Sequence, residues 1–211
     1  MRSRRLRCAN QRRARATGAM AFQEEAPRRM LVPIFDLDGT LLDSDAALTG
    51  AFVALGVAAE SITFGHVLAD ECARLGLSLE AYLDAYDHDA ALPFPGVEEM
   101  LAGLERRGRC WSLCSNKHSS SGRRELARLG WQPAVALFSE DFGGPKRLDL
   151  VLEAIGLDAA GAIFVGDTAH DRACAADAGV AFALAGWNPR ALPRPGDTVL
   201  AAPAELLPLL R

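Results

Sequence analysis

Two aspartates stand two residues apart, directly after a short apolar run. Residues 31–35 read LVPIF, and residues 36–40 read DLDGT. Alternate side chains of an extended segment point to the same side, so we expect the carboxyl groups of Asp36 and Asp38 to stand beside each other. One carboxylate of such a pair can attack as a nucleophile while the other transfers protons. Gly39 would let backbone amides approach a bound anion closely.

Three further polar stretches also follow apolar runs. Residues 115–117 read SNK, Lys146 follows a GGP turn, and residues 166–171 read GDTAHD. Because the carboxyl ends of parallel strands meet at one edge of a sheet, we expect these groups to converge there. Asp171 lies one helical turn beyond Asp167, so the two carboxylates could serve the same site.

The aspartates form an oxygen-rich ligand set, which is the chemistry that Mg²⁺ prefers. We expect Asp36, Asp167 and the backbone carbonyl of Asp38 to supply the protein ligands of such an ion. Asp171 would either join them or orient a metal-bound water. The sequence therefore predicts a magnesium site built from aspartates that follow two different strands.

The remaining polar groups fit the binding of a phosphate. Ser115 and the backbone amide of Asn116 can bind phosphate oxygens where a helix begins. Lys146 would neutralise charge on the nucleophile and on the transferring phosphoryl group. It is one of only two lysines among 23 basic residues. The role of the other, Lys117, stays open at this stage.

Six short apolar runs alternate with helical patterns along the chain. In residues 97–104 and 148–155, apolar side chains recur at i, i+3, i+4 and i+7. Short runs without polar alternation are typical of buried parallel strands. Strands that alternate with helices predict a doubly wound α/β fold with a parallel sheet. The expected strands are 31–35, 110–114, 135–138, 162–165, 180–184 and 198–200.

The interval from residue 44 to residue 93 breaks this alternation. It carries no strand pattern, and a PFPG turn follows at its end. The helices expected within it are 45–55, 61–75 and 78–86. We therefore expect a small helical cap inserted after the first strand. The expected domains are a basic leader at 1–29, a catalytic core at 30–43 and 94–211, and the cap at 44–93.

The charge of the chain is uneven. Residues 1–29 carry nine arginines against two glutamates, and we expect them to be a disordered extension, with later start codons at Met20 and Met30. A transit-peptide-like segment, or an arm that binds nucleic acid or membrane, is the alternative. The other residues carry 14 basic and 25 acidic side chains, which argues against nucleic-acid binding by the core.

Composition also indicates the cellular compartment to expect. Half of the 211 residues are hydrophobic, enough for a packed core, yet no apolar run approaches the roughly 20 residues of a membrane-spanning helix. The five cysteines form no CxxC pair, so neither a zinc site nor a disulfide framework is indicated. We expect a protein of the reducing cytoplasm without a membrane partner. The sequence leaves its oligomeric state open.

The four motifs together resemble those of the haloacid dehalogenase superfamily, in its branch of helical-cap phosphatases similar to phosphoglycolate phosphatases. The resemblance is carried, in family order, by DLDGTL at 36–41, SNK at 115–117, Lys146, and GDT at 166–168 with Asp171. It implies magnesium-dependent hydrolysis of a small phosphorylated metabolite through an aspartyl phosphate on Asp36. Asp38 would then be the general acid and base.

Other activities of this superfamily fit less well. Its metal-independent dehalogenases lack the second acid of the first motif, whereas Asp38 is present here. Its phosphonate-cleaving members, and its sugar-phosphate mutases, use a cap lysine, and residues 41–94 contain none. A module that only binds a phosphorylated metabolite would not need Asp36 beside Asp38. The mutase, the dehalogenase and the binding module stay as alternatives.

Recognition of the rest of the substrate would fall to the cap. Arg74 is the only arginine or lysine between Thr40 and Pro95, so it is our first candidate to contact an acidic substrate. His66 and His88 and the cap tyrosines are further candidates. A cap of about 50 residues is short, which favours larger or more varied substrates.

Overall fold

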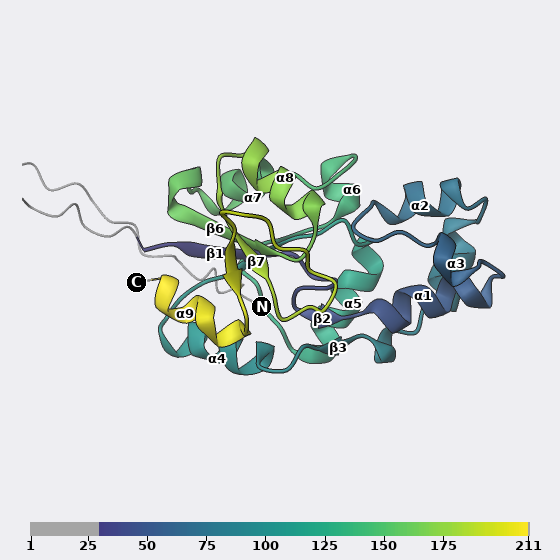
Figure 1. Ribbon diagram of the computed structural model, residues 1–211, viewed down its shortest axis with the longest axis horizontal. Helices are drawn as coiled ribbons and strands as arrows, with labels where there is room; N and C mark the ends of the chain where they lie inside the picture. The colour runs from purple at the N-terminus through teal and green to yellow at the C-terminus, as the bar shows by residue number, and fades with distance from the viewer. Residues whose placement is uncertain (1–29, 211) are drawn as a thin grey trace, which may run out of the picture.

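A six-stranded parallel sheet forms the centre of the protein (Figure 1). The computed structural model describes residues 30–210. The strand order is β5-β4-β1-β6-β7-β8, and every neighbouring pair is parallel. The strands are β1 (Val32–Phe35), β4 (Ser112–Cys114), β5 (Ala136–Leu137), β6 (Ala162–Gly166), β7 (Ala181–Ala185) and β8 (Thr198–Leu200). Each lies in or overlaps an apolar run that predicted it, so the doubly wound α/β fold is confirmed.

Helices cover both faces of the sheet, which is why its strands read as continuous apolar runs. Ile34 and Phe164 belong to one buried cluster, which includes side chains of α7 (Leu148–Ile155) and α8 (Ala169–Asp177). Phe35 belongs to the other cluster, with side chains from the opposite face. Figure 1 shows α7 and α8 above the sheet and α4 and α9 below it. The remaining core helices are α4 (Val97–Arg106), α5 (Ser119–Leu129), α6 (Ser139–Phe142) and α9 (Leu206–Leu209), with short 3-10 turns η3 (Ala159–Gly161) and η4 (Pro203–Glu205).

Three helices form the insert that projects from one end of the sheet (Figure 1). They are α1 (Asp45–Ala54), α2 (Leu68–Arg74) and α3 (Leu79–Ala85), with 3-10 turns η1 (Ala59–Ser61) and η2 (His88–Ala90). Phe52 and Tyr82 of this cap belong to the same buried cluster as Phe35 of the core. Apolar packing therefore continues from the cap into the core.

The ends of the insert are joined by a two-stranded antiparallel ribbon, β2 (Leu42–Asp43) with β3 (Leu92–Pro93). The expectation that residues 44–93 contain no strand is therefore wrong at the end of that interval. Strands of two residues are too short to produce an alternating pattern, and proline is tolerated at such an edge. The exact domain boundaries at 44 and 93 stay a prediction.

The second cap helix is shorter than expected. The apolar spacing predicted a helix over 61–75, but α2 begins only at Leu68. The residues before it form a loop in which Gly65 adopts a positive φ of 85°, a conformation that a helix does not accept. This loop reaches the functional site described below.

The predictions for the basic leader cannot be compared with this structure, because residues 1–29 lie outside the described residues. Within residues 30–210, no helix is long and apolar enough to cross a membrane.

Candidate active site

The loop after β1 carries the two aspartates of the first motif. The backbone amide of Asp36 donates to the carbonyl of Val165 on β6 at 2.9 Å, which fixes the point where the loop leaves the sheet. Gly39 then turns the chain with a φ of 75°. A Cβ atom at Gly39 would lie 2.4 Å from Asp167 Oδ2, so no larger residue fits without displacing that carboxylate.

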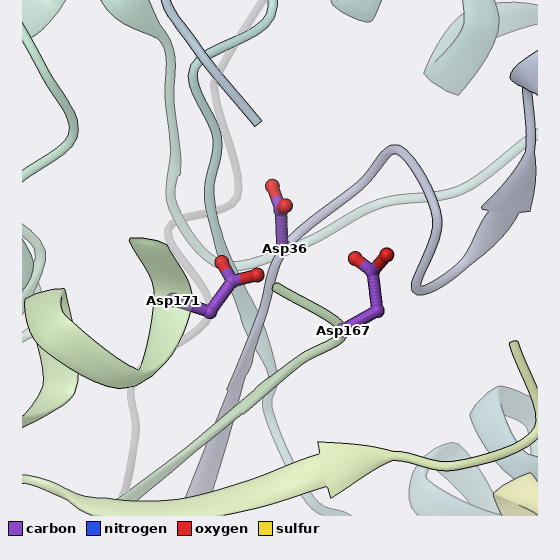
Figure 2. Close-up of side chains that lie close together, drawn as sticks. All are labelled: Asp36, Asp167 and Asp171. Atoms are coloured by element: carbon purple, nitrogen blue, oxygen red, sulfur yellow. The ribbon is translucent and has the colours of Figure 1, made fainter. Parts of the chain in front are cut away.

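Three buried carboxylates meet at this edge of the sheet, as the sequence predicted. Asp36 follows β1, Asp167 follows β6, and Asp171 lies in the first turn of α8. One oxygen from each lies within 4.8 Å of the others. Figure 2 shows the three side chains approaching a common space from these separate elements.

Lys146 lies among these carboxylates. Its ammonium group is 2.9 Å from Asp36 Oδ2 and also forms an ion pair with Asp171. Asp171 is held further by the amide of Thr168 at 2.8 Å. Burial alone would lower the pKa of Lys146, but the charges of Asp171 and Asp36 outweigh it and raise the pKa. Lys146 is therefore a fixed cation beside Asp36.

Asp36 keeps one oxygen free. Its Oδ1 is buried and has no hydrogen-bond partner, whereas Oδ2 faces Lys146. Burial, with the neighbouring Asp171 and Asp38, raises the pKa of Asp36 to about 6 despite the lysine. An unpartnered buried carboxylate oxygen costs free energy unless a ligand satisfies it.

The donor set fits a hard divalent cation. Burial is also the main cause that raises the pKa of Asp167, to about 8, followed by repulsion from Asp171 and Asp36. Three carboxylates against one ammonium leave an excess of negative charge in a buried space. Mg²⁺ would compensate this charge with the oxygen ligands that it prefers.

One residue that supports this cluster was missed by the sequence analysis. Asn188 is 2% exposed, and its Nδ2 donates to Asp167 Oδ2 and to the Gly39 carbonyl, both at 2.9 Å. It follows β7 by three residues, so it stands at the same edge of the sheet as the other polar motifs. Applying the strand-end rule to this fifth strand would have found it.

Asn116 of the second motif joins the segment of Lys146 to the cap. Ser115 is 1% exposed and lies at the cavity described below. The side chain of Asn116 accepts from the Lys146 amide at 2.6 Å and donates to the cap carbonyl of Gly65 at 2.8 Å. The structure thus brings Ser115, Asn116 and Lys146 together, and Asn116 additionally contacts the cap.

Lys117, whose role the sequence left open, contacts Asp38. Its ammonium group donates to Asp38 Oδ1 at 2.7 Å and to the Tyr86 hydroxyl at 2.9 Å, and it lies 3.1 Å from Glu125 Oε1. Burial would lower the pKa of Lys117, but the charges of Asp38 and Glu125 raise it. Asp38 is therefore tied to a buried network that the motifs alone do not reveal.

A cavity between the cap and the core opens onto these residues. On the core side it is lined by Asp36, Asp38, Ser115, Asn116, Lys117, Lys146, Asp167, Thr168 and Arg190. On the cap side it is lined by Leu48, Phe52, Ile62, Thr63, Phe64, Gly65, His66, Leu68 and Glu71. The charged groups are thus concentrated at the core end, and the cap end is mainly apolar.

Comparison with known proteins decides the family of this chain. Residues 33–185, most of the chain, match the family described as haloacid dehalogenase-like hydrolase. The chain belongs to the haloacid dehalogenase-like hydrolases. The resemblance read from its four motifs is therefore confirmed.

The similar proteins with curated descriptions are phosphatases. A phosphoglycolate phosphatase of Xylella fastidiosa is 33% identical over 192 residues, which cover 78% of this chain and 82% of that protein. An N-acetylmuramic acid 6-phosphate phosphatase of Pseudomonas aeruginosa is 27% identical over 215 residues, covering 86% of this chain and 95% of that protein. This hydrolase is accordingly an enzyme of the phosphatase type within its family.

Solved structures agree on the fold. A hydrolase from Pseudomonas syringae superimposes with a TM-score of 0.67 at 24% identity, covering 85% of this chain and 97% of that one. A haloacid dehalogenase-like family protein from Streptococcus pneumoniae gives a TM-score of 0.64 at 20% identity, covering 87% and 99%. At these identities the likeness speaks for the fold alone.

Arg74, the cap residue that the sequence singled out, does not line the cavity of this hydrolase. Its guanidinium group instead binds the Glu71 carboxylate at 2.6–2.7 Å and the Ser61 carbonyl at 2.6 Å. Burial would raise the pKa of Glu71, but the bonds from Arg74 and Thr63 lower it to about 2. A contact of Arg74 with substrate stays a prediction, and in this structure Arg74 orients Glu71.

The arginine that does line the cavity is Arg190, from the core loop after β7. Its guanidinium carbon lies 4.0 Å from the centre of the Phe64 ring, and it forms an ion pair with Asp45 at the start of α1. No motif in the sequence pointed to Arg190. Among the other cap candidates, His66 lines the cavity and packs edge-on against His170, with ring centres 4.6 Å apart.

Proposed function

We propose that this hydrolase is a magnesium-dependent phosphatase that cleaves a small phosphomonoester through an aspartyl phosphate on Asp36. One observation carries the proposal: among the described residues, the buried Oδ1 of Asp36 has no hydrogen-bond partner, although the same carboxyl group lies beside Lys146 and two further carboxylates. A structural carboxylate would be expected to have both oxygens satisfied.

The residues that would hold Mg²⁺ are Asp36, Asp167 and the backbone carbonyl of Asp38, and Asn188 would orient Asp167. When bound, the ion supplies positive charge that offsets the negative charge of the phosphoryl oxygens. Asp171 is already bonded to Lys146 and Thr168. Its contacts favour a role in positioning the lysine over a role as a direct ligand.

The reaction would proceed in two displacements by groups of this chain. In the first, a carboxylate oxygen of Asp36 forms a bond to phosphorus while the ester oxygen leaves and takes a proton from Asp38. In the second, water gives a proton to Asp38 and attacks the same phosphorus. The bond to Asp36 then breaks, and inorganic phosphate is released with both aspartates restored.

The phosphate group would be bound at the core end of the cavity. Ser115, Asn116 and Lys146 line this end of the cavity together with Asp36, and they would bind the phosphate through the Ser115 hydroxyl, the Asn116 backbone amide and the Lys146 ammonium group. Lys146 is held on two carboxylates, so its charge is in place before the phosphate arrives. Such preorganised charge is the most effective form of electrostatic catalysis.

The rest of the substrate would lie against the cap end of the cavity. The named substrates of the two curated relatives, phosphoglycolate and N-acetylmuramic acid 6-phosphate, are both acids as well as phosphates. In this chain, Lys117 and Lys146 are each buried between two carboxylates, whereas Arg190 pairs with one carboxylate, that of Asp45, and its side chain is about one-third exposed. We therefore infer that the substrate carries an acidic group that pairs with Arg190.

The decisive experiment measures hydrolysis of p-nitrophenyl phosphate with Mg²⁺ and with EDTA, for the wild type and for Asp36→Asn. We expect activity that requires Mg²⁺ and falls by roughly 10⁴-fold or more in the variant. Mass mapping of protein trapped with substrate should place the phosphoryl adduct on residue 36. Activity that survives EDTA, or an adduct at another residue, would exclude the mechanism.

A further inference from the structure

A buried network connects the cap to Asp38, and its centre is the ammonium group of Lys117. The side chain of Lys117 is 3% exposed. An ammonium group has three N–H donors, and acceptors from Asp38, Tyr86 and Glu125 lie within 2.7–3.1 Å of the nitrogen. Because all three donors have partners, Lys117 has none left for a substrate phosphate. Its effect on the reaction must pass through the groups that it holds.

The three partners come from separate parts of the fold. Asp38 belongs to the loop after β1, Glu125 lies on α5 of the core, and Tyr86 ends α3 of the cap. The Tyr86 hydroxyl accepts from Lys117 and donates to Glu125 Oε1 at 2.8 Å. The network therefore contains two hydrogen bonds, both of the Tyr86 hydroxyl, that exist only while the cap lies on the core.

Glu125 is a costly residue at this position. It is fully buried on α5, its Oε2 has no partner, and burial raises its pKa to about 7. A buried carboxylate with one unsatisfied oxygen is weak support for stability, and an apolar side chain would pack there at lower cost. Its placement is explained by what it holds, since Glu125 Oε1 contacts both the Lys117 ammonium group and the Tyr86 hydroxyl.

Asp38 and Lys117 both line the cavity, but Asp38 is the more exposed of the two. Its side chain is 20% exposed, and its Oδ1 is bound by Lys117. Holding one oxygen restricts rotation of the carboxyl group, so the other oxygen is directed by the same contact. A proton donor must be aligned with the leaving oxygen to be effective, and a small displacement of the donor lowers the reaction rate strongly.

We propose that Lys117, Glu125 and Tyr86 are positioning residues that align Asp38 for proton transfer only when the cap is closed. This inference rests on the proposed function, because it assigns Asp38 as the general acid. Displacement of the cap removes the Tyr86 hydroxyl from Lys117, and Asp38 then loses its fixed orientation. Proton transfer to the leaving alcohol is thereby restricted to the closed, substrate-filled cavity.

The test compares kcat/KM for two substrates in the wild type, Tyr86→Phe and Lys117→Met. An alkyl phosphate needs a proton on its leaving oxygen, whereas p-nitrophenol leaves readily as an anion. We expect Tyr86→Phe to lower kcat/KM for the alkyl phosphate by about 3–10-fold and Lys117→Met by about 10–100-fold. For p-nitrophenyl phosphate both variants should stay within about twofold of the wild type.

Tyr82→Phe is the matched control. Tyr82 is a buried cap tyrosine whose ring lies 6.0 Å from that of Tyr86, but its hydroxyl contacts only the Leu48 carbonyl, at 3.4 Å. Its removal should change neither substrate's kcat/KM. A merely structural effect of losing a cap hydroxyl would appear equally in this control.

The outcomes separate the two proposals. If Tyr86→Phe and Lys117→Met lower kcat/KM equally for both substrates, or change neither, the positioning role is wrong while the phosphatase mechanism stands. If Lys117→Met does not fold, Tyr86→Phe alone decides. If the wild type has no Mg²⁺-dependent activity, the proposed function fails, and this inference fails with it.

Discussion

The core end and the cap end of the cavity are built on different principles. At the core end, Asp171 and Lys146 are nine-tenths or more buried and bonded to named partners, and Asp167 is held by Asn188. At the cap end, Phe52, Ile62 and Leu68 form an apolar wall, and Arg190 reaches this end from the core through one ion pair with Asp45 and one ring contact with Phe64. The core end is charged and its side chains are bonded to one another, whereas the cap end is mainly apolar.

From this difference we infer that the core end serves catalysis and the cap end serves substrate selection. Groups that stabilise a transition state must be fixed in advance, and a network of bonds at strand ends provides that. Groups that select a substrate need only distinguish shapes and charges in an apolar site. Changes at the core end should therefore affect every substrate, and changes at the cap end only some.

The largest effect is expected from Asp38→Asn. The amide cannot exchange protons, so kcat/KM for an alkyl phosphate should fall by about 10²–10⁴-fold. Steady-state kinetics with two chemically different alkyl phosphates measure it, and a thermal melt controls for folding. A loss below about tenfold, or a loss for one substrate only, would contradict the division between the two ends.

Asn188→Ala should weaken the proposed magnesium site without removing a ligand. Asp167 Oδ2 loses its donor, and the Gly39 carbonyl loses the same partner. Loss of such a supporting bond typically costs about 10–100-fold in metal affinity. Titration of activity with MgCl₂ should show a half-saturating concentration raised by that factor, with most activity recovered at high Mg²⁺. An unchanged titration curve would argue that Asn188 only supports the loop.

Arg190→Gln and Arg74→Gln form a matched pair at the cap end. Arg74 pairs with Glu71 and Arg190 pairs with Asp45, but of these two arginines only Arg190 lines the cavity. We expect Arg190→Gln to raise KM for a phosphomonoester that carries a carboxylate by about tenfold, because a charge-assisted hydrogen bond is lost. Arg74→Gln should change it less than about twofold, and p-nitrophenyl phosphate should be insensitive to both. The reverse result would return the specificity role to Arg74.

The smallest effect concerns stability of the metal-free protein. The folded pKa of Asp167 is raised to about 8, so its protonated form stabilises the fold at low pH, and this contribution is lost as the pH rises through that value. With EDTA present, Tm should fall by about 3 °C or more between about pH 6 and about pH 9. Asp167→Asn, or wild type with Mg²⁺, should show a smaller fall. A Tm that rises over this range would contradict the predicted direction.

The core end could be predicted because apolar runs in a sequence show where buried strands end. Apolar runs located β1, β4 and β6, and the polar residues that follow them had to meet at one edge. The meeting of Asp36 and Asp167 follows from that rule, whereas Lys146 comes only after α6 and a further turn. The compartment and the nature of the basic leader, in contrast, stay predictions.

The cap end could not be predicted in the same way. Arg190 meets Phe64 across loops that are 126 residues apart in sequence, and neither loop has a periodic pattern. The network of Lys117 with Tyr86 and Glu125 also depends on how the cap rests on the core. A residue spacing reports local geometry, but contacts between an insert and its host depend on tertiary packing that no local pattern encodes.

The ribbon of β2 and β3 makes the insert a replaceable part. Since Leu42 pairs directly with Pro93, the two points at which the chain leaves and re-enters the core are neighbours. An insert attached at adjacent points can be exchanged without rerouting its host. Exchanging the segment between these residues for that of a relative should change the cap end of the cavity while the chain path of the loop after β1 is kept, so new specificities would be accessible by recombination at a single junction.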